Sequence, residues 1–229
     1  MPSSPAALIG TAVHAGAAAY DEARRSGAPI PMDEAALIAR DAVEHPEQEV
    51  DWRNDEYTKT EALMVAGWTT GLYVTRVADT MTYVSVEEQL PDVTIRVGEV
   101  DITLTGHVDR IRIDDTGAVG VSDLKTGRRI HPAVHRPQLA VYRTMATVAR
   151  PELAITGNDE IIAMDINNGT VERVALPGDS MAMLVGSEGR PGLLHHVASM
   201  MKNETFYGNP RSQLCSAKFC PRYKACPFK

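Results

Sequence analysis

The first 80 residues carry apolar side chains at the spacing of helices. Residues 6–26 are rich in alanine, repeat apolar positions every three to four residues, and end at Ser26-Gly27, which predicts a helix. Two more helices are predicted over 33–44 and 56–79, on either side of a polar segment at about 45–55. We therefore expect a helical N-terminal part.

From Met81 onward the pattern changes to Val, Ile and Thr residues that alternate in places with polar ones. This pattern predicts strands, separated by breaks at Pro91-Asp92 and by a hairpin turn at 114–117. Helical spacing returns at 134–149 and over most of 178–202, whereas the segment from 206 onward has no clear period. The predicted strands are 82–88, 93–97, 100–113, 118–124, 159–165 and 170–176.

This order of elements predicts an α/β fold with a central mixed sheet flanked by helices. We expect a single domain over residues 1–229, because the sequence has no repeat and no low-complexity linker. Its parts would be the helical segment 1–80, a core at 81–176, and a C-terminal helix with a cysteine-containing tail at 177–229.

The composition describes an ordinary globular protein, with 44% hydrophobic and 23% charged residues. No apolar run approaches the roughly 20 residues that a membrane span needs, so we expect a cytoplasmic protein without a membrane partner. The net charge of −7 argues against nucleic acid as a partner. However, residues 124–150 hold six basic side chains and residues 211–229 hold five, with no acidic residue in either stretch. Such stretches are most often solvated surfaces, but they would also suit a polyanion.

Two aspartates and a lysine gather in the predicted strand pair around the hairpin turn. Pairing of the strands would bring Asp109 close to Asp123, and the two-residue spacing of Asp123 and Lys125 places both on one face. Separately, each residue has an ordinary structural explanation, such as a turn or a cap. Together, two carboxylates beside an ammonium suit a bound Mg²⁺ or Mn²⁺ ion and the hydrolysis of phosphodiester bonds.

Four short motifs then resemble a known family. Gly106-His-Val-Asp109-Arg-Ile, Ser122-Asp-Leu-Lys-Thr-Gly127 and Gln138-x3-Tyr142 follow one another, and Gly10-x3-His14 precedes them. In this order they resemble the RecB-like exonucleases of the PD-(D/E)XK nuclease superfamily, over roughly residues 8–229. The resemblance implies a restriction-endonuclease-like core.

The resemblance also implies roles for individual residues. Asp109, Asp123, His14 and the backbone carbonyl of Leu124 would bind Mg²⁺ or Mn²⁺, and Lys125 would act on the attacking water. DNA would be positioned by Gln138 and Tyr142, for which helix packing is an equal alternative, and by Arg128, Arg129 and Arg136. Glu88, on the strand before the hairpin, is a weaker candidate for the site.

The three cysteines, Cys215-x4-Cys220-x5-Cys226, are clustered as in a metal site. The RecB-like nucleases with iron–sulfur clusters use one further cysteine upstream of the histidine motif, and this sequence has none there. A 4Fe-4S cluster with an unidentified fourth ligand, a zinc site and a set of buried thiols therefore all stay open.

From these features we predict a metal-dependent DNA exonuclease that acts in recombination, repair or phage DNA processing. Its partner would be DNA, either single-stranded or with free ends, and a second copy of the chain or a recombination protein is a further candidate partner. Two alternatives of a different class are an inactive RecB-like module that binds DNA or protein, and a structural metal-binding module.

Overall fold

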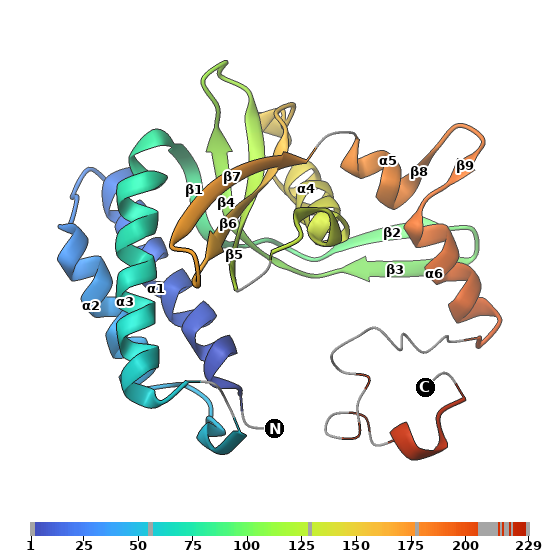
Figure 1. The fold of residues 1–229 in the computed structure, drawn as a ribbon. Helices are drawn as coiled ribbons and strands as arrows, with labels where there is room; N and C mark the ends of the chain where they lie inside the picture. The colour runs from blue at the N-terminus through green and yellow to red at the C-terminus, as the bar shows by residue number, and fades with distance from the viewer. Residues whose placement is uncertain are drawn as a thin grey trace.

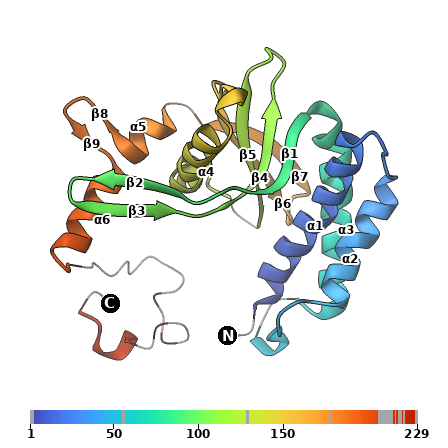
Figure 2. The ribbon, with the colours of Figure 1, turned by 180° about the vertical axis from the view of Figure 1, so that it is seen from behind.

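The computed structural model describes residues 3–54, 57–127, 130–176, 179–205, 215, 217, 220 and 222–227. Three helices form a layer against one face of a five-stranded sheet, and a fourth helix covers the other face (Figures 1 and 2). The layer consists of α1 (Pro5–Arg25), α2 (Met32–Glu44) and α3 (Lys59–Arg76). None of the helices in these ranges combines the length and the apolar character needed to cross a membrane.

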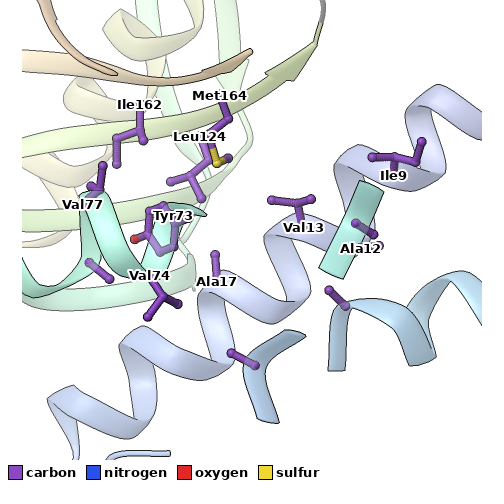
Figure 3. Packing of buried hydrophobic residues seen from close by; sticks show 14 of the residues in the cluster. Ile9, Ala12, Val13, Ala17, Tyr73, Val74, Val77, Leu124, Ile162 and Met164 are labelled. Atoms are coloured by element: carbon purple, nitrogen blue, oxygen red, sulfur yellow. The ribbon is translucent and has the colours of Figure 1, made fainter. Parts of the chain in front are cut away.

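The N-terminal helices begin at residues that satisfy their free backbone amides. Ser4 accepts a hydrogen bond from the amide of Ala7 at 3.2 Å, and Thr58 forms a capping box with Glu61 at the start of α3. The many alanines on the buried faces let the helices approach closely. Leu124, Ile162 and Met164 of the sheet then point into the same apolar cluster as α1 and α3 (Figure 3).

The central sheet is mixed, as predicted. It consists of β1 (Thr82–Gln89), β4 (His107–Ile113), β5 (Val119–Gly127), β6 (Asp159–Asp165) and β7 (Thr170–Leu176), in the order β1-β4-β5-β6-β7. Only β5 and β6 are parallel, because α4 (Arg136–Ala149) connects them across the sheet. The hairpin turn between β4 and β5 falls at the predicted place, where Asp114 accepts hydrogen bonds from the amides of Thr116 and Ala118.

One predicted strand was wrong in length, and one segment predicted to be mostly helical is interrupted. The expected strand 100–113 is two strands, β3 (Val100–Leu104) and β4, and β3 pairs only with β2 (Val93–Val97) in a separate hairpin. The expected helix over 178–202 is interrupted, because glycines and a proline between 186 and 192 do not continue a helix. That segment contains α5 (Ser180–Val185), β8 (Gly186–Ser187), β9 (Arg190–Pro191) and α6 (Leu193–Lys202). Short 3-10 turns occur at Trp52–Asn54, Ala78–Thr80, Pro132–His135, Pro151–Leu153 and Tyr223–Ala225.

A buried polar network joins the helical layer to the sheet. The side chain of Arg110 on β4 is fully buried, and its Nε donates to Asp21 Oδ2 of α1 at 2.7 Å. Tyr73 of α3 donates to the same oxygen at 2.6 Å, and the hydroxyl of Tyr83 on β1 lies 2.7 Å from that of Tyr73. Because four elements meet in this network, the position of α1 relative to the sheet depends on it.

The network contains charge that its partners satisfy only in part. Asp21 Oδ1 and Arg110 Nη2 are buried without a hydrogen-bonding partner among the described residues. Burial raises the pKa of Asp21, and the charge of Arg110 opposes this shift without cancelling it. The carboxylate of Asp21 is therefore held ionised mainly by one guanidinium.

We expect the Arg110→Met substitution to lower the free energy of unfolding by about 3–5 kcal/mol near neutral pH, because it leaves a buried carboxylate without its cation. The pKa of Asp21 in the folded state would rise further above its unfolded value of about 3.9, so stability is lost as pH rises between those two values. Urea denaturation at a series of pH values measures this.

The double variant Asp21→Asn, Arg110→Met serves as the control, since it removes both charges and should recover part of the lost stability at neutral pH. A deficit of Arg110→Met that stayed constant from about pH 4 to about pH 7 would contradict the role given to Asp21.

Candidate active site

The candidate aspartate Asp109 lies where β4 and β5 separate. The last residue pair of the β4–β5 ladder is Arg110–Ser122. Beyond it, Asp109 Oδ2 accepts a hydrogen bond from the backbone amide of Leu124 at 2.8 Å. The carboxylate thus takes the place of a strand partner, which fixes it against the β5 backbone.

His14 reaches the same point from α1. Its Nε2 lies 2.9 Å from the carbonyl oxygen of Leu124, and because a carbonyl only accepts, Nε2 must carry the proton. The other ring nitrogen, Nδ1, lies 3.5 Å from Asp109 Oδ2. One turn earlier, a Cβ on Gly10 would stand 3.0 Å from the Thr126 hydroxyl, so the glycine of the G-x3-H motif lets α1 approach β5.

Glu87 also belongs to this cluster, and sequence reasoning missed it. Its Oε1 lies 3.7 Å from His14 Nδ1 and accepts from Arg110 Nη1 at 2.9 Å, while Oε2 lies 3.2 Å from His107 Nδ1. Burial tends to raise the pKa of Glu87, but His14 and Arg110 outweigh it, so the pKa is lowered and the carboxylate stays ionised.

The weaker candidate Glu88 lies elsewhere and pairs with Arg150 at 2.8 Å. The difference arises from the irregular backbone of β1, which has a register shift between Tyr83 and Ser85 and a left-handed φ of +47° at Glu87. Such a φ costs a non-glycine residue roughly 1–3 kcal/mol and breaks the alternation on which a strand assignment rests. A glutamate pair on the strand before the hairpin was the available signal, and it did not say which of the two faces the site.

His14, Glu87 and Asp109 form a compact set of potential metal ligands. One ligand atom from each lies within 4.8 Å of the others, and the part of the chain that the structure describes contains no second such group. The two carboxylates also affect the imidazole. Burial alone would lower the pKa of His14, but Glu87 and Asp109 together raise it. Two carboxylates and an imidazole suit a divalent cation such as Mn²⁺ or Mg²⁺.

Asp123 and Lys125 lie beside this set but are not part of it. Both project from the same side of β5, and Lys125 Nζ is 2.6 Å from Asp123 Oδ2. Apart from this ion pair, Oδ2 is buried without a hydrogen-bonding partner among the described residues. Burial and the nearby charge of Asp109 raise the pKa of Asp123 to about 6, despite the opposing charge of Lys125. The carboxylates of Asp109 and Asp123 therefore carry more negative charge than Lys125 neutralises.

Gln138 and Tyr142 share one face of α4, as their spacing predicted. Gln138 Nε2 donates to the Tyr142 hydroxyl at 2.7 Å. Burial raises the pKa of Tyr142, and the charges of Asp109, Asp123 and Glu87 add to this, which places the phenol near all three carboxylates. The ring also packs against Gly106, where a Cβ would come within 3.1 Å of it. The two residues thus combine helix packing with proximity to the site.

The basic stretch 124–150 contains arginines predicted to contact DNA and arginines that pair with carboxylates of the fold. Arg136 is the first residue of α4, and Arg128 and Arg129 lie outside the described residues. Arg143 instead binds the carboxylate of Asp159 at 2.8 Å, and Arg150 pairs with Glu88. At least two of the six cations therefore stabilise the fold.

The cysteines Cys215, Cys220 and Cys226 are free and half-buried. They do not come together with other ligands into a group of three within the described ranges. The structure thus gives no support to a 4Fe-4S cluster, which stays a prediction.

Comparison with known proteins adds one finding to this geometry. The family model of the PD-(D/E)XK nuclease superfamily matches residues 2–227, which includes His14, Glu87, Asp109, Asp123 and Lys125. A search among curated proteins finds no match. Because the family match spans nearly the whole chain and the fold is a mixed sheet flanked by helices, the chain belongs to the PD-(D/E)XK nuclease superfamily.

Proposed function

We propose that this protein is a metal-dependent DNA exonuclease with its active site at the separation of β4 and β5. The observation that carries the proposal is the ligand set of His14, Glu87 and Asp109 beside the Asp123–Lys125 ion pair. In the superfamily to which the chain belongs, nuclease activity is the typical function.

The residues at the site fit a divalent cation. His14, Glu87 and Asp109 would hold it, and Asp123 and the Leu124 carbonyl are further predicted ligands. The carbonyl already accepts a hydrogen bond from His14, but an oxygen of this kind has a second lone pair. Asp123 is buried beside the charge of Asp109, and its pKa stays raised although Lys125 is paired with it, which indicates negative charge that a further cation would neutralise. When bound, a divalent cation polarises the phosphoryl group and makes a bound water more acidic.

The side chains of the protein would supply the remaining chemistry. Lys125 is held in place by Asp123 and stays partly exposed, so its ammonium can donate to a water or a phosphate oxygen at the site. Gln138 holds the hydroxyl of Tyr142 by a hydrogen bond, and the charges of the three carboxylates act on this phenol. From this position it can orient a phosphate. Arg136 and the neighbouring Arg128 and Arg129 would contact phosphates on either side of the scissile bond.

Preference for DNA ends, and a role in recombination, repair or phage DNA processing, rest on the resemblance of the motifs to RecB-like exonucleases. The main alternative is a module of the same fold that binds DNA without cutting it. The intact set of carboxylates and the lysine favours the nuclease, because a binding module has no use for a charged cluster held at this cost.

With Mn²⁺ or Mg²⁺, the protein should degrade end-labelled linear DNA and leave covalently closed circular DNA intact. Asp123→Ala and Lys125→Ala should each lower the rate by about 100-fold or more, because each removes charge at the reacting phosphate. Gel analysis of single- and double-stranded substrates, with EDTA as a blank, measures this.

Lys202→Ala is the matched control, since Lys202 pairs with Glu99 on an exposed surface and should leave the rate unchanged. DNA binding without any cleavage would favour the alternative module, and cleavage of closed circles would contradict an exonuclease.

A comparison of Glu87→Gln with Glu88→Gln tests the ligand set directly. Titration calorimetry with Mn²⁺ should show an affinity at least roughly tenfold weaker for Glu87→Gln, because a ligand charge is lost, and an unchanged affinity for Glu88→Gln. Circular dichroism would establish that both variants are folded. Equal effects of the two substitutions would mean that Glu87 is not a ligand.

A further inference from the structure

The outer surface of α2 and α3 carries several strongly exposed, large apolar side chains. Met32, Leu37 and Met64 lie on it, with Leu37 61% exposed. Trp68 is also exposed there, although the tip of its ring packs on Gly169 of the β6–β7 turn. These are four of the eight large apolar side chains that are strongly exposed in the described part of the chain. Scattered apolar residues need no explanation, but a contiguous group on two adjacent helices indicates a contact surface.

This surface, which we call the α2–α3 face, comprises Met32, Asp33, Leu37, Arg40, Met64 and Trp68. Two depressions of about 500 Å³ and about 340 Å³ lie between the two helices. Leu37 and Met64 line the larger one, and Met32 and Trp68 line the smaller. Arg40 borders both and therefore stands at the middle of the face.

Arg40 and Asp33 are exposed charges without an ion-pair partner among the described residues. The stem of Arg40 lies across Gly67 of α3, where a Cβ would come within 2.5 Å of its Nε. The Nε side of the guanidinium thus lies against the α3 backbone, while the residue as a whole stays exposed. Other charges at the rim are already paired, as Asp41 is with His45 and Glu44 is with Lys59. A partner that covered this face would remove both charges from water, so it must supply an opposite charge for each.

A second copy of this chain supplies them. Asp33 and Arg40 are seven residues apart, which is about two helical turns, so they lie on the same stripe of α2. If two α2 helices pack antiparallel about a two-fold axis near Ala36 and Leu37, each Arg40 faces the Asp33 of the other copy. The contact is self-complementary, as a two-fold interface must be. DNA is a poor occupant, because the face carries the unpaired carboxylate of Asp33 and large apolar side chains, neither of which binds a phosphate backbone.

We propose that this protein forms a homodimer through the α2–α3 face, with reciprocal Asp33–Arg40 ion pairs around a centre formed by Leu37. Figures 1 and 2 show that α2 lies on the outside of the helical layer, away from the sheet. The face that His14 turns to β5 lies on the other side of that layer, so both active sites of the dimer stay open to DNA.

Charge reversal within the single chain tests the pairing. Wild-type protein should have twice the monomer mass of 24.9 kDa in light scattering after gel filtration. Arg40→Asp should weaken the dimer by roughly 10- to 100-fold in Kd, because it turns both ion pairs into carboxylate pairs. Asp33→Arg should do the same. The double variant Asp33→Arg, Arg40→Asp restores opposite charges at both places, and its Kd should return to within about threefold of wild type.

Two further variants separate this interface from a general effect of charge. Leu37→Glu should give a monomer, since it buries a carboxylate at the centre of the contact, and Arg96→Asp on the distant β2–β3 hairpin should leave the dimer intact. Thermal unfolding of each variant verifies that it is folded. A monomeric wild-type protein at the highest soluble concentration would overturn the proposal. So would a double variant as weak as the singles, which would point to a different partner on this face.

Discussion

The position of the helical layer on the sheet depends on the contacts of the Arg110 guanidinium. It is completely buried and binds Asp21 of α1, Glu87 of β1 and the backbone carbonyl of its neighbour Asp109. Arginine keeps its charge in such a place, so the carboxylates around it can stay ionised where burial would otherwise protonate them. A lysine has a single nitrogen, so it could not donate from two separate positions as Nε and Nη1 of Arg110 do.

Arg110 therefore connects the scaffold of the fold directly to the candidate site. The same side chain that attaches α1 to the sheet also holds Glu87, and α1 in turn carries His14. Displacement of the helical layer would therefore change the ligand set directly. The opening between β4 and β5 adds the second constraint, since Asp109 binds the Leu124 amide that the ladder leaves free. His14 uses the carbonyl of the same residue, so the backbone groups of Leu124 orient two of the candidate ligands, one from β4 and one from α1.

Much of this site was predictable from the sequence, and the remainder was not for definite physical reasons. His14, Asp109, Asp123 and Lys125 stand in motifs whose spacing translates directly into position on a helix or strand. Glu87 does not stand in such a motif. A residue with a left-handed backbone breaks the alternation of a strand, so alternation cannot locate it. The predicted strand 82–88 pointed equally to its neighbour Glu88. The burial of Arg110 was also hidden, since an arginine on a strand is ordinarily assigned to the surface. The long strand predicted at 100–113 was divided at Thr105-Gly106, a break that Val and Ile on both sides obscured.

Internal ion pairs also change how the distribution of basic residues along the sequence is interpreted. A count along the sequence treats every cation in 124–150 as available to DNA, yet Arg143 and Arg150 bind carboxylates of the fold. Arg112 of β4 is likewise buried against Glu160 of β6, across the intervening β5. Each internal ion pair joins one basic and one acidic side chain. Such pairs therefore leave the net charge of −7 unchanged but reduce the number of cations at the surface. Within the stretch 124–150, the cations left to meet a DNA backbone are then a few residues near Lys125. If the proposed nuclease binds DNA, these residues would direct the phosphates to the place where the carboxylates can hold a metal ion.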